Sequence, residues 1–340
     1  MNLADYLDRT KLAQYIHEGW VVVRQHDTLP LNIYSYSRKT VYANKWDDIT
    51  TKTRGLIVHR DTGEIVARPY EKFFAYNWEG RSETYPRSVE NVEREFGPPV
   101  ITEKVNGCLG TFWKYNQHWG IATKGSFHSP HAAFATKWME DHIEHNGKLV
   151  FPEGYTPVFE IICQDIQPHV IKYPADKVVL LNFIKIDTGE ELNLFRTKLY
   201  ANTNLLETPF PYVKMSFTEA LTDDSEEFEG YVATYNRPGQ PPLKLKIKFP
   251  TFLKNRKLFY EEQKLKVEEK ANTELREKAR EIVKQALVLC TTRKEFAEFF
   301  NRPENKQYAS ECFALLDYDK QEKDVINGSG EGSPEAVPVG

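Results

Sequence analysis

A lysine that follows a short strand-like segment is the residue of this chain best placed for covalent chemistry. Lys104 lies three residues before Gly107, and a largely apolar run follows from Leu109 to Trp113. This order predicts a strand, a tight turn in which Gly107 adopts a positive φ, and a second strand. A lysine amine becomes a nucleophile when desolvation or nearby cations lower its pKa from about 10.4. The sequence should therefore bring more positive charge close to Lys104.

Three further lysines alternate with apolar residues in the stretch 243–249. A strand has a side-chain period of two, so its leucines, isoleucine and phenylalanine face one side, while Lys244, Lys246 and Lys248 line the other. One face can then pack into a core and the other can present a row of ammonium groups. An ordinary solvated sheet surface would give the same pattern, so the alternation alone leaves the role of the lysines open.

Two carboxylates interrupt segments that are otherwise apolar. Glu160 lies within 158–162 and Glu229 begins the stretch 229–235. A carboxylate among apolar residues is costly unless it is paired, hydrogen-bonded or bound to a metal. Each carboxylate could accept a hydrogen bond from a hydroxyl group or hold a hydrated cation. Each could equally belong to a residue at the edge of a sheet whose side chain reaches water.

Cations at three other places suit phosphate binding. Arg54 opens a strand, Lys72 lies in the aromatic segment 68–77, and Lys124 ends a strand just before Gly125. Each also suits a packed loop. The sequence has neither glycine-rich phosphate-loop pattern, and its histidine pairs spaced by three residues have no third ligand and are interpreted as helix-surface histidines.

Composition and length bound the architecture. The chain has 340 residues, 40% of them hydrophobic and 13% aromatic, which suits one large domain and a smaller one. The net charge is −4, so nucleic-acid binding would need a local basic patch. Four scattered cysteines and the absence of a signal-peptide pattern predict free thiols and a cytoplasmic location. No apolar run is long enough for a membrane span.

The order of the expected elements predicts an α+β fold. A helix over 3–16 ends at Gly19, and residues 20–252 contain mostly strands, with one helix over 131–145. Helices then follow at 264–289, 293–300 and 308–316. The predicted domains are therefore 1–254, a helical part at 255–326 and a disordered tail at 327–340.

Taken together and in chain order, these motifs resemble those of the covalent nucleotidyltransferases, the superfamily of ATP-dependent ligases and capping enzymes. The motifs are 104–107, 124–126, 159–161, 180–183, 229–232 and 245–248, preceded by 54–57 and 68–74. The set is similar in particular to the T4 RNA ligase 1 family and to the ligase domains of fungal tRNA ligases. The resemblance covers about 51–252. It implies a nucleotidyltransferase domain, ATP-grasp-like, of antiparallel sheets flanked by helices, followed here by a small all-helical domain.

The resemblance also implies a reaction that joins RNA ends in three steps. Lys104 would attack the α-phosphorus of ATP to give lysyl-AMP, AMP would pass to an RNA 5′-phosphate, and an RNA 3′-hydroxyl would displace it. Lys246 and Lys248 would hold the α-phosphate, and Arg54 and Lys72 the outer phosphates. The implied partners are ATP, Mg²⁺ or Mn²⁺, and RNA with single-stranded or tRNA ends, and we expect a monomer that does not bind membranes.

Further roles follow from the same resemblance. Lys124 would lie near the transferred group, Glu160 would accept a ribose hydroxyl, and Glu229 would anchor the hydrated metal. Asn106 replaces the acidic residue that the family usually has before its glycine, as in the fungal tRNA ligases. The remaining nucleotide contacts would come from Thr102, Glu103, Gly107 and Phe183. Lys244 has no counterpart and is expected to be exposed.

Two other classes of protein share parts of this pattern. A DNA ligase or capping enzyme usually has a β-barrel domain after the last lysine motif, where this chain is predicted to be helical, and DNA ligases have an arginine at the position of Leu109. A non-catalytic nucleotide- or RNA-binding module would not need Lys104, the two lysines Lys246 and Lys248, and both carboxylates. The ligase interpretation accounts for all of these residues together.

Overall fold

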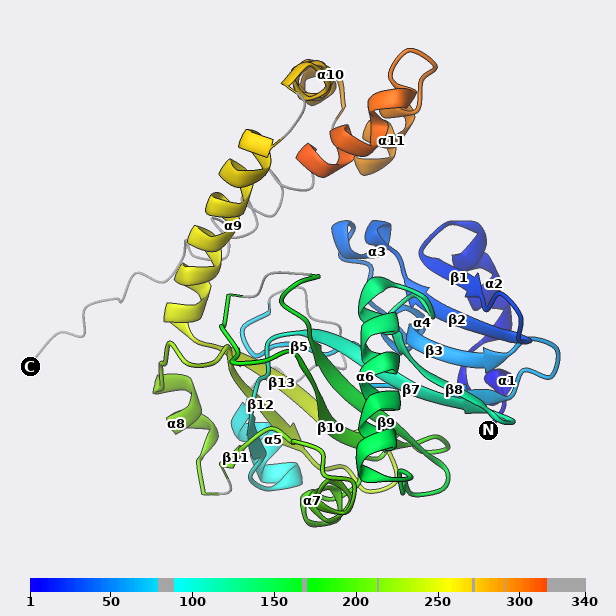
Figure 1. Cartoon of the computed structure of the whole chain (residues 1–340), viewed down its shortest axis with the longest axis vertical. Helices are drawn as coiled ribbons and strands as arrows, with labels where there is room; N and C mark the ends of the chain where they lie inside the picture. The colour runs from blue at the N-terminus through cyan, green and yellow to red at the C-terminus, as the bar shows by residue number, and fades with distance from the viewer. Residues whose placement is uncertain (79–88, 167–169, 213, 271–272, 291, 317–340) are drawn as a thin grey trace, which may run out of the picture. The chain divides into compact units, whose positions relative to one another are not determined.

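The computed structural model describes residues 1–78, 89–166, 170–212, 214–270, 273–290 and 292–316 (Figure 1). The chain divides into two compact units, Met1–Phe252 and Leu253–Gly340. Sheets and helices alternate in the first unit, and the predicted α+β class is confirmed. The predicted disordered tail at 327–340 lies outside the described residues. No helix in the described part of the chain is long and apolar enough to cross a membrane.

The first sheet is antiparallel and holds the N-terminal part of the chain, in the order β1-β2-β3-β4. Its strands are β1 (Val21–Gln25), β2 (Leu31–Tyr36), β3 (Arg54–His59) and β4 (Ile65–Ala67). A hairpin that turns at Gly63 connects β3 and β4. Arg54, the first residue of β3, thereby begins a central strand of the sheet.

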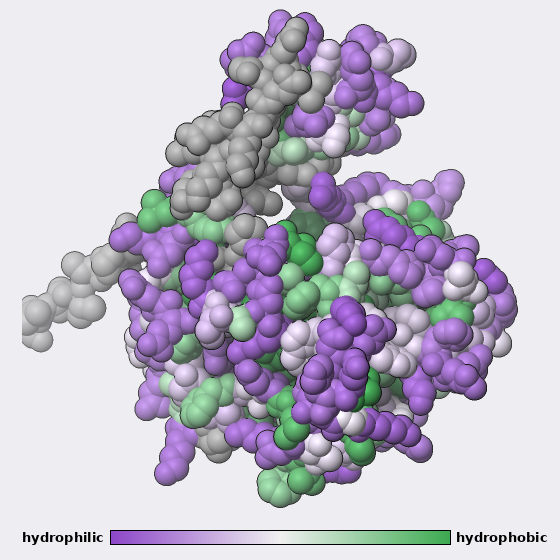
Figure 2. Space-filling view, viewed as in Figure 1, coloured by the Kyte–Doolittle hydropathy of each residue, from purple (hydrophilic) through white to green (hydrophobic). Residues whose placement is uncertain are grey.

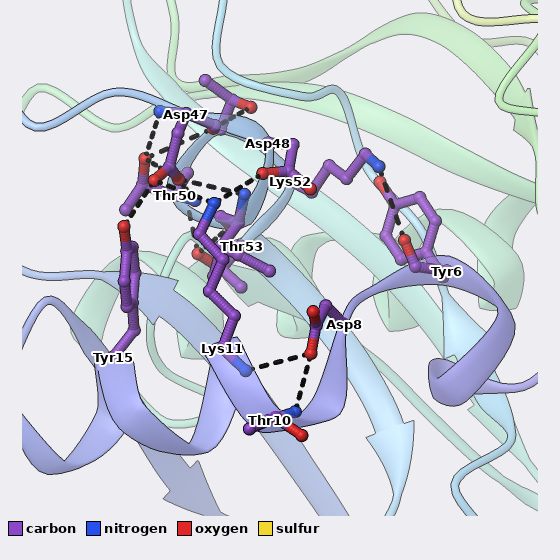
Figure 3. Close-up of polar contacts among 12 residues, drawn as sticks. Tyr6, Asp8, Thr10, Lys11, Tyr15, Asp47, Asp48, Thr50, Lys52 and Thr53 are labelled. Carbon is purple, nitrogen blue, oxygen red and sulfur yellow. Dashed lines mark hydrogen bonds and ion pairs between the residues drawn. The ribbon is translucent and has the colours of Figure 1, made fainter.

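Short helices brace this sheet and fix where β3 begins. They are α1 (Leu3–Tyr6), α2 (Arg9–His17), α3 (Arg38–Tyr42) and α4 (Asp48–Lys52). The single helix predicted over 3–16 is wrong, because Asp8 caps α2 by accepting hydrogen bonds from the backbone of Thr10 and Lys11. Tyr15 donates to Asp47 at 2.6 Å and Lys11 pairs with Asp48 at 3.1 Å, which ties α2 to α4 (Figure 3).

The second sheet is antiparallel in the order β10-β9-β7-β8. Its strands are β7 (Cys108–Tyr115), β8 (His118–Thr123), β9 (Tyr155–Ile162) and β10 (Lys177–Lys185). Helix α6 (Pro130–Asn146) crosses one face of it, and α7 (Leu194–Thr203) follows β10. The outward face of α6 is mostly hydrophilic (Figure 2), whereas its buried Ala132, Ala135 and Met139 pack toward β8 and β9.

The third sheet carries the row of lysines. Its order is β11-β6-β12-β13-β5, and β13 pairs with β5 in parallel while the other pairs are antiparallel. The strands are β5 (Phe74–Ala75), β6 (Val100–Glu103), β11 (Pro211–Tyr212), β12 (Gly230–Tyr235) and β13 (Leu243–Lys248). Helices α5 (Val89–Phe96) and α8 (Phe217–Thr222) belong to the same part of the chain. Leu245, Ile247 and Phe249 are fully buried in the core, which confirms the predicted alternation.

The segment between β6 and β7 joins two different sheets. Lys104 follows β6 of the third sheet, and Cys108 begins β7 of the second, so the predicted hairpin is wrong. Gly107 also does not have a positive φ. A Cβ at this position would lie 2.4 Å from the carbonyl oxygen of Ile161, so glycine is required by a close approach to β9.

The second unit is helical. It contains most of α9 (Pro250–Lys270), together with α10 (Thr273–Leu289), α11 (Arg293–Phe300), η1 (Lys306–Tyr308) and a helix over 309–316. Ile282, Phe300 and Cys312 lie in its core. The helix predicted over 264–289 is instead described as two, and α9 begins at Pro250, where a proline suits the first helical position. All four cysteines are free, as predicted.

Candidate active site

Glu229 joins three residues that the sequence places far away from it. Lys104 Nζ lies 2.7 Å from Glu229 Oε2, and Lys248 Nζ lies 2.7 Å from Oε1. Asn106 Nδ2 also donates to Oε2 at 3.0 Å. Burial raises the pKa of Glu229, but the ammonium groups of Lys104 and Lys248 outweigh it and lower the pKa to about 2. The carboxylate is therefore ionised and holds the predicted nucleophile in place.

The strand register explains why these groups meet. Gly230 at the start of β12 is opposite Lys248 of β13, while Tyr231 is opposite Glu103 of β6. Glu229 consequently reaches the end of both neighbouring strands. The Lys104 amide donates to the carbonyl of Gly230 at 2.8 Å. A Cβ on Gly230 would lie 2.1 Å from the carbonyl oxygen of Ile247, so this junction admits only glycine.

Glu160 approaches the same residues from the second sheet. Its Oε1 accepts a hydrogen bond from the Gly107 amide at 3.0 Å. Burial raises the pKa of Glu160, Glu229 raises it further, and Lys104 and Arg54 lower it. Glu229 and Glu160, which come from different sheets, therefore both lie close enough to Lys104 for its charge to act on them.

The remaining predicted cations lie close enough together that each lowers the pKa of its neighbours. Burial, followed by Lys72, Arg54, Lys104 and Lys248, holds the pKa of Lys246 far below its usual value. The pKa of Lys72 falls to about 7, through burial and then through Arg54, Lys124 and Lys248. Ammonium groups that repel one another in this way bind an anion strongly, because the anion relieves the repulsion.

A cavity of about 250 Å³ opens beside Lys104. The predicted residues that line it are Arg54, Thr102, Glu103, Lys104, Gly107, Glu160 and Lys246. Glu229 contacts Lys104 directly, and Asn106 and Lys248 are linked to this lysine through their own contacts with Glu229. The Nε atom of Arg54 is buried without a hydrogen-bond partner among the described residues. A buried donor in that state is costly, and an anionic ligand in the cavity would satisfy it.

This geometry agrees with the comparison of the chain with known families. The model of the RNA ligase family matches residues 52–271, which is more than half of the chain. The chain belongs to the RNA ligase family.

Individual relatives of the family are distant in sequence. A protein of Thermovibrio ammonificans that is provisionally named an RNA ligase is 26% identical over 211 residues, which cover 58% of this chain and 51% of that protein. The chain thus spans about half the length of this curated relative.

Solved structures show weaker likeness. An RNA ligase from Naegleria gruberi, solved with PPi, has a TM-score of 0.38 and 17% identity, covering 52% of this chain and 58% of that one. A provisionally named ATP-dependent DNA ligase from Aquifex aeolicus has a TM-score of 0.49 and 12% identity, covering 94% of this chain and 78% of that one.

Besides Asn106, Glu229 and Lys248, three predicted residues do not line this cavity: Phe183, Lys72 and Lys124. Phe183 is fully buried in the core, with its ring 5.5 Å from that of Phe151 and 5.4 Å from that of Tyr200. An irregularity in the pairing of β10 lets Leu181 and Asn182 line the cavity instead. Lys72 lines a neighbouring cavity of about 550 Å³.

Lys244 is not exposed, and the prediction that it would be is wrong. Its Nζ lies 2.6 Å from Glu191 and donates to Thr234 at 3.0 Å, and the residue is 9% exposed. It also lies 4.7 Å from the centre of the Tyr70 ring. Nothing in the alternating pattern of 243–249 distinguishes this lysine from Lys246 and Lys248, because its partner Glu191 is remote in sequence.

Phe73 and Tyr70 line the cavity and were not predicted as site residues. Lys246 Nζ lies 4.5 Å from the centre of the Phe73 ring, and the guanidinium of Arg54 lies 5.5 Å from it. Both cations therefore lie against the same aromatic ring. The aromatic run at 70–74 was the signal available in the sequence.

Proposed function

We propose that this protein is an ATP-dependent RNA ligase that joins an RNA 5′-phosphate to a 3′-hydroxyl. The observation that carries the proposal is the convergence of Lys104, Lys248 and Asn106 on the buried carboxylate of Glu229, beside a cavity that also contains Glu160. Membership of the RNA ligase family favours this activity over DNA ligation or mRNA capping. A binding module would have no need for a lysine held in this way.

In the first step, Lys104 Nζ would attack the α-phosphorus of ATP and release pyrophosphate. The attack forms one N–P bond and breaks one P–O bond, and the amine loses its protons to solvent. Lys104 must exchange its contact with Glu229 for the phosphorus atom when the nucleotide binds. Lys248 remains in contact with Glu229 and can keep the carboxylate neutralised meanwhile.

Positive charge would supply most of the rate enhancement, since phosphoryl transfer depends chiefly on positioning and charge. Lys246 and Lys248 would hold the α-phosphate. Arg54 and Lys72 would hold the outer phosphates, which fits the buried Arg54 Nε that has no partner among the described residues. Lys124 would approach the phosphate that is transferred.

Glu160 would accept a hydrogen bond from a ribose hydroxyl of the nucleotide. The backbone amide of Gly107 already orients this carboxylate at 3.0 Å. Asn106 is fixed at two points, because its side chain donates to Glu229 and its amide donates to the Tyr173 hydroxyl at 2.8 Å. We infer that Asn106 positions Glu229 and does not itself hold a metal.

The residues present fit a divalent metal that is held mainly by phosphate oxygens and water. Mg²⁺ commonly takes one or two carboxylates in such sites, and Glu229 and Glu160 are the carboxylates available here. The described residues contain no cluster of three acidic, histidine or cysteine ligands. When bound, the metal would supply positive charge that offsets the repulsion between anions.

AMP would then pass from Lys104 to the 5′-phosphate of an RNA strand, and the 3′-hydroxyl of a second strand would displace it. We propose that residues 1–254 carry out these steps and that the helical residues 255–326 contribute to the choice of RNA. A tRNA substrate, a monomeric state and a cytoplasmic location stay predictions from the sequence.

The decisive experiment uses ATP labelled at the α-phosphate. Purified protein with Mg²⁺ or Mn²⁺ should acquire covalent label, and Lys104→Ala should not, because Lys104 both contacts Glu229 and lines the cavity, whereas Lys248 contacts Glu229 without lining it. Lys137→Ala serves as the matched control, since Lys137 is 68% exposed on α6. Absence of label on the parent protein, or full labelling of Lys104→Ala, would reject the proposal.

A further inference from the structure

A group of cations continues outward from the proposed ATP site into a part of the chain that precedes the family match. Arg24 lies on β1 and Arg38 begins α3, whereas the match begins at residue 52. We call Arg24, Arg38 and Lys124 the outer basic patch. Arg54 is close to both this patch and the inner cations, because its charge lowers the pKa of Lys124, Lys72 and Lys246.

The pairing of the first sheet places Arg24 and Arg54 on one face. Arg24 is opposite Ile33, and Ser35, two residues further along β2, is opposite Arg54. Opposite residues of an antiparallel pair point to the same side of the sheet, and so do residues two apart. Arg24 and Arg54 therefore lie on a common face, two strands apart and offset by two residues along the strand direction, which corresponds to roughly 12 Å.

Lys124 and its neighbour approach this same face from the end of β8. Arg24 Nη1 donates to the carbonyl oxygen of Gly125. Lys124 Nζ lies 4.0 Å from the centre of the Tyr36 ring, and Tyr36 is the last residue of β2. Two residues after Tyr36, Arg38 opens α3. Backbone and ring contacts thus hold Arg24 and Lys124 close together, and Arg38 follows directly after the strand end that Lys124 contacts.

The electrostatic result is that the outer cations repel one another. Burial and the charges of Arg54, Arg24 and Arg38 lower the pKa of Lys124 to about 8. Like charges held together by the fold are destabilising unless an anion lies between them. Guanidinium groups suit a phosphate in particular, because their donors match its oxygens in pairs.

We propose that Arg24 and Arg38, together with Lys124, bind the 5′-terminal phosphate of the RNA strand that receives AMP. The inference rests on the proposed function and names the substrate group that these residues serve. A terminal phosphate carries a charge of about −1.5 to −2 and three acceptor oxygens, whereas the 3′ end presents a neutral hydroxyl. In the lysyl-AMP form, Lys246 and Lys248 are engaged by the phosphate of AMP, and the outer basic patch offers further cations for the second anion of the reaction.

The test isolates the transfer of AMP from the formation of lysyl-AMP. Protein already carrying labelled AMP is mixed with a 5′-phosphorylated single-stranded RNA below saturation, and the rate of RNA-adenylate formation is followed in a single turnover. Arg24→Ala and Arg38→Ala should each lower this rate by about 10- to 100-fold, the usual effect of losing a charge-assisted contact. Arg60→Ala, on the hairpin after β3 and paired with Asp61, should not change it.

Arg24→Lys and Arg38→Lys are measured in parallel. Both keep the positive charge and should recover part of the rate, even if Arg24→Ala disturbs the contact with Gly125. Labelling of the parent protein with ATP decides the proposed function separately. With that labelling present, an unchanged transfer rate in both alanine variants would overturn the inference. So would loss of self-labelling, which would assign the patch to ATP.

Binding of RNA to the adenylylated protein separates an end from a backbone contact. Arg24→Ala and Arg38→Ala should weaken binding of the 5′-phosphorylated strand by about 10-fold or more, and binding of the same strand with a 5′-hydroxyl by less than about 2-fold. An equal loss for both strands would show that the patch contacts backbone phosphates, and would overturn the assignment to the terminal phosphate.

Discussion

The two ends of β13 carry similar lysine–glutamate pairs, to which we assign different purposes. Lys248 lies 2.7 Å from Glu229 at one end, and Lys244 lies 2.6 Å from Glu191 at the other. Both glutamates are nearly inaccessible, with side chains 3% and 6% exposed. Distance and burial alone therefore do not distinguish a reactive pair from a structural one.

The difference lies in what else each glutamate contacts. Glu229 also holds Lys104, a side chain that lines the cavity and follows directly on the end of β6. Glu191 instead accepts a hydrogen bond from Asn182 at 2.9 Å, and Asn182 is in turn bound by Thr197 at 2.8 Å. One carboxylate is shared with a second amine that can react, and the other is part of a network that joins the second and third sheets.

The largest effect is expected at the Glu229 end. Glu229→Gln keeps the shape of the side chain but removes the charge that holds Lys104 and Lys248, so covalent labelling with ATP should fall by about 100-fold or more. Lys248→Ala should cause a loss of similar size. Glu207→Gln is the matched control, because Glu207 forms an exposed pair with Lys177.

A contrary outcome would be near-normal labelling of Glu229→Gln with unchanged circular dichroism. In that case Glu229 would be structural, like Glu191, and the contrast between the two ends of β13 would disappear.

At the Glu191 end we expect a loss of stability. Lys244→Met leaves a buried carboxylate without its cation, which typically costs about 3–5 kcal/mol and, in a unit of this size, lowers the melting temperature by about 6–12 °C. Labelling per folded molecule should change by less than about 10-fold. Thermal unfolding followed by circular dichroism measures the first quantity.

The double change Lys244→Met with Glu191→Leu should restore part of that stability, since replacing both members of a buried pair by apolar residues is often neutral. If Lys244→Met instead abolished labelling without lowering the melting temperature, Lys244 would belong to the reaction.

The alternation along 243–249 was enough to predict which face of β13 is buried. The resemblance of the ordered motifs, and not this alternation, indicated that Lys246 and Lys248 belong to the site. The ordered motifs correctly placed Lys104, Glu160 and Glu229 together. These features depend on local sequence and on the resemblance of the ordered motifs to those of the covalent nucleotidyltransferases.

Features that depend on contacts between remote segments could not be predicted. Lys244 pairs with a residue 53 positions away. Phe183 was displaced into the core by a one-residue irregularity in β10, which reverses the direction of every later side chain. Gly107 is required by the close approach of Ile161 on β9, the strand that pairs with β7, which the turn pattern alone does not reveal.

The smallest effect concerns Lys72, and it depends on pH. The pKa of Lys72 is lowered to about 7, so this residue is cationic below that pH and neutral above it. If Lys72 holds the outer phosphates of ATP, KM for ATP should rise by several-fold as the pH increases from about 6 to 8.5. Bound phosphate favours the ammonium form and moves the midpoint of this change upward from pH 7.

Lys72→Arg stays charged throughout this range and should show a flatter pH profile of KM. Equal pH profiles of KM in the two proteins, measured as the rate of labelling against ATP concentration, would remove Lys72 from the phosphate site and leave Arg54 and Lys246 as the cations that the ATP phosphates meet there.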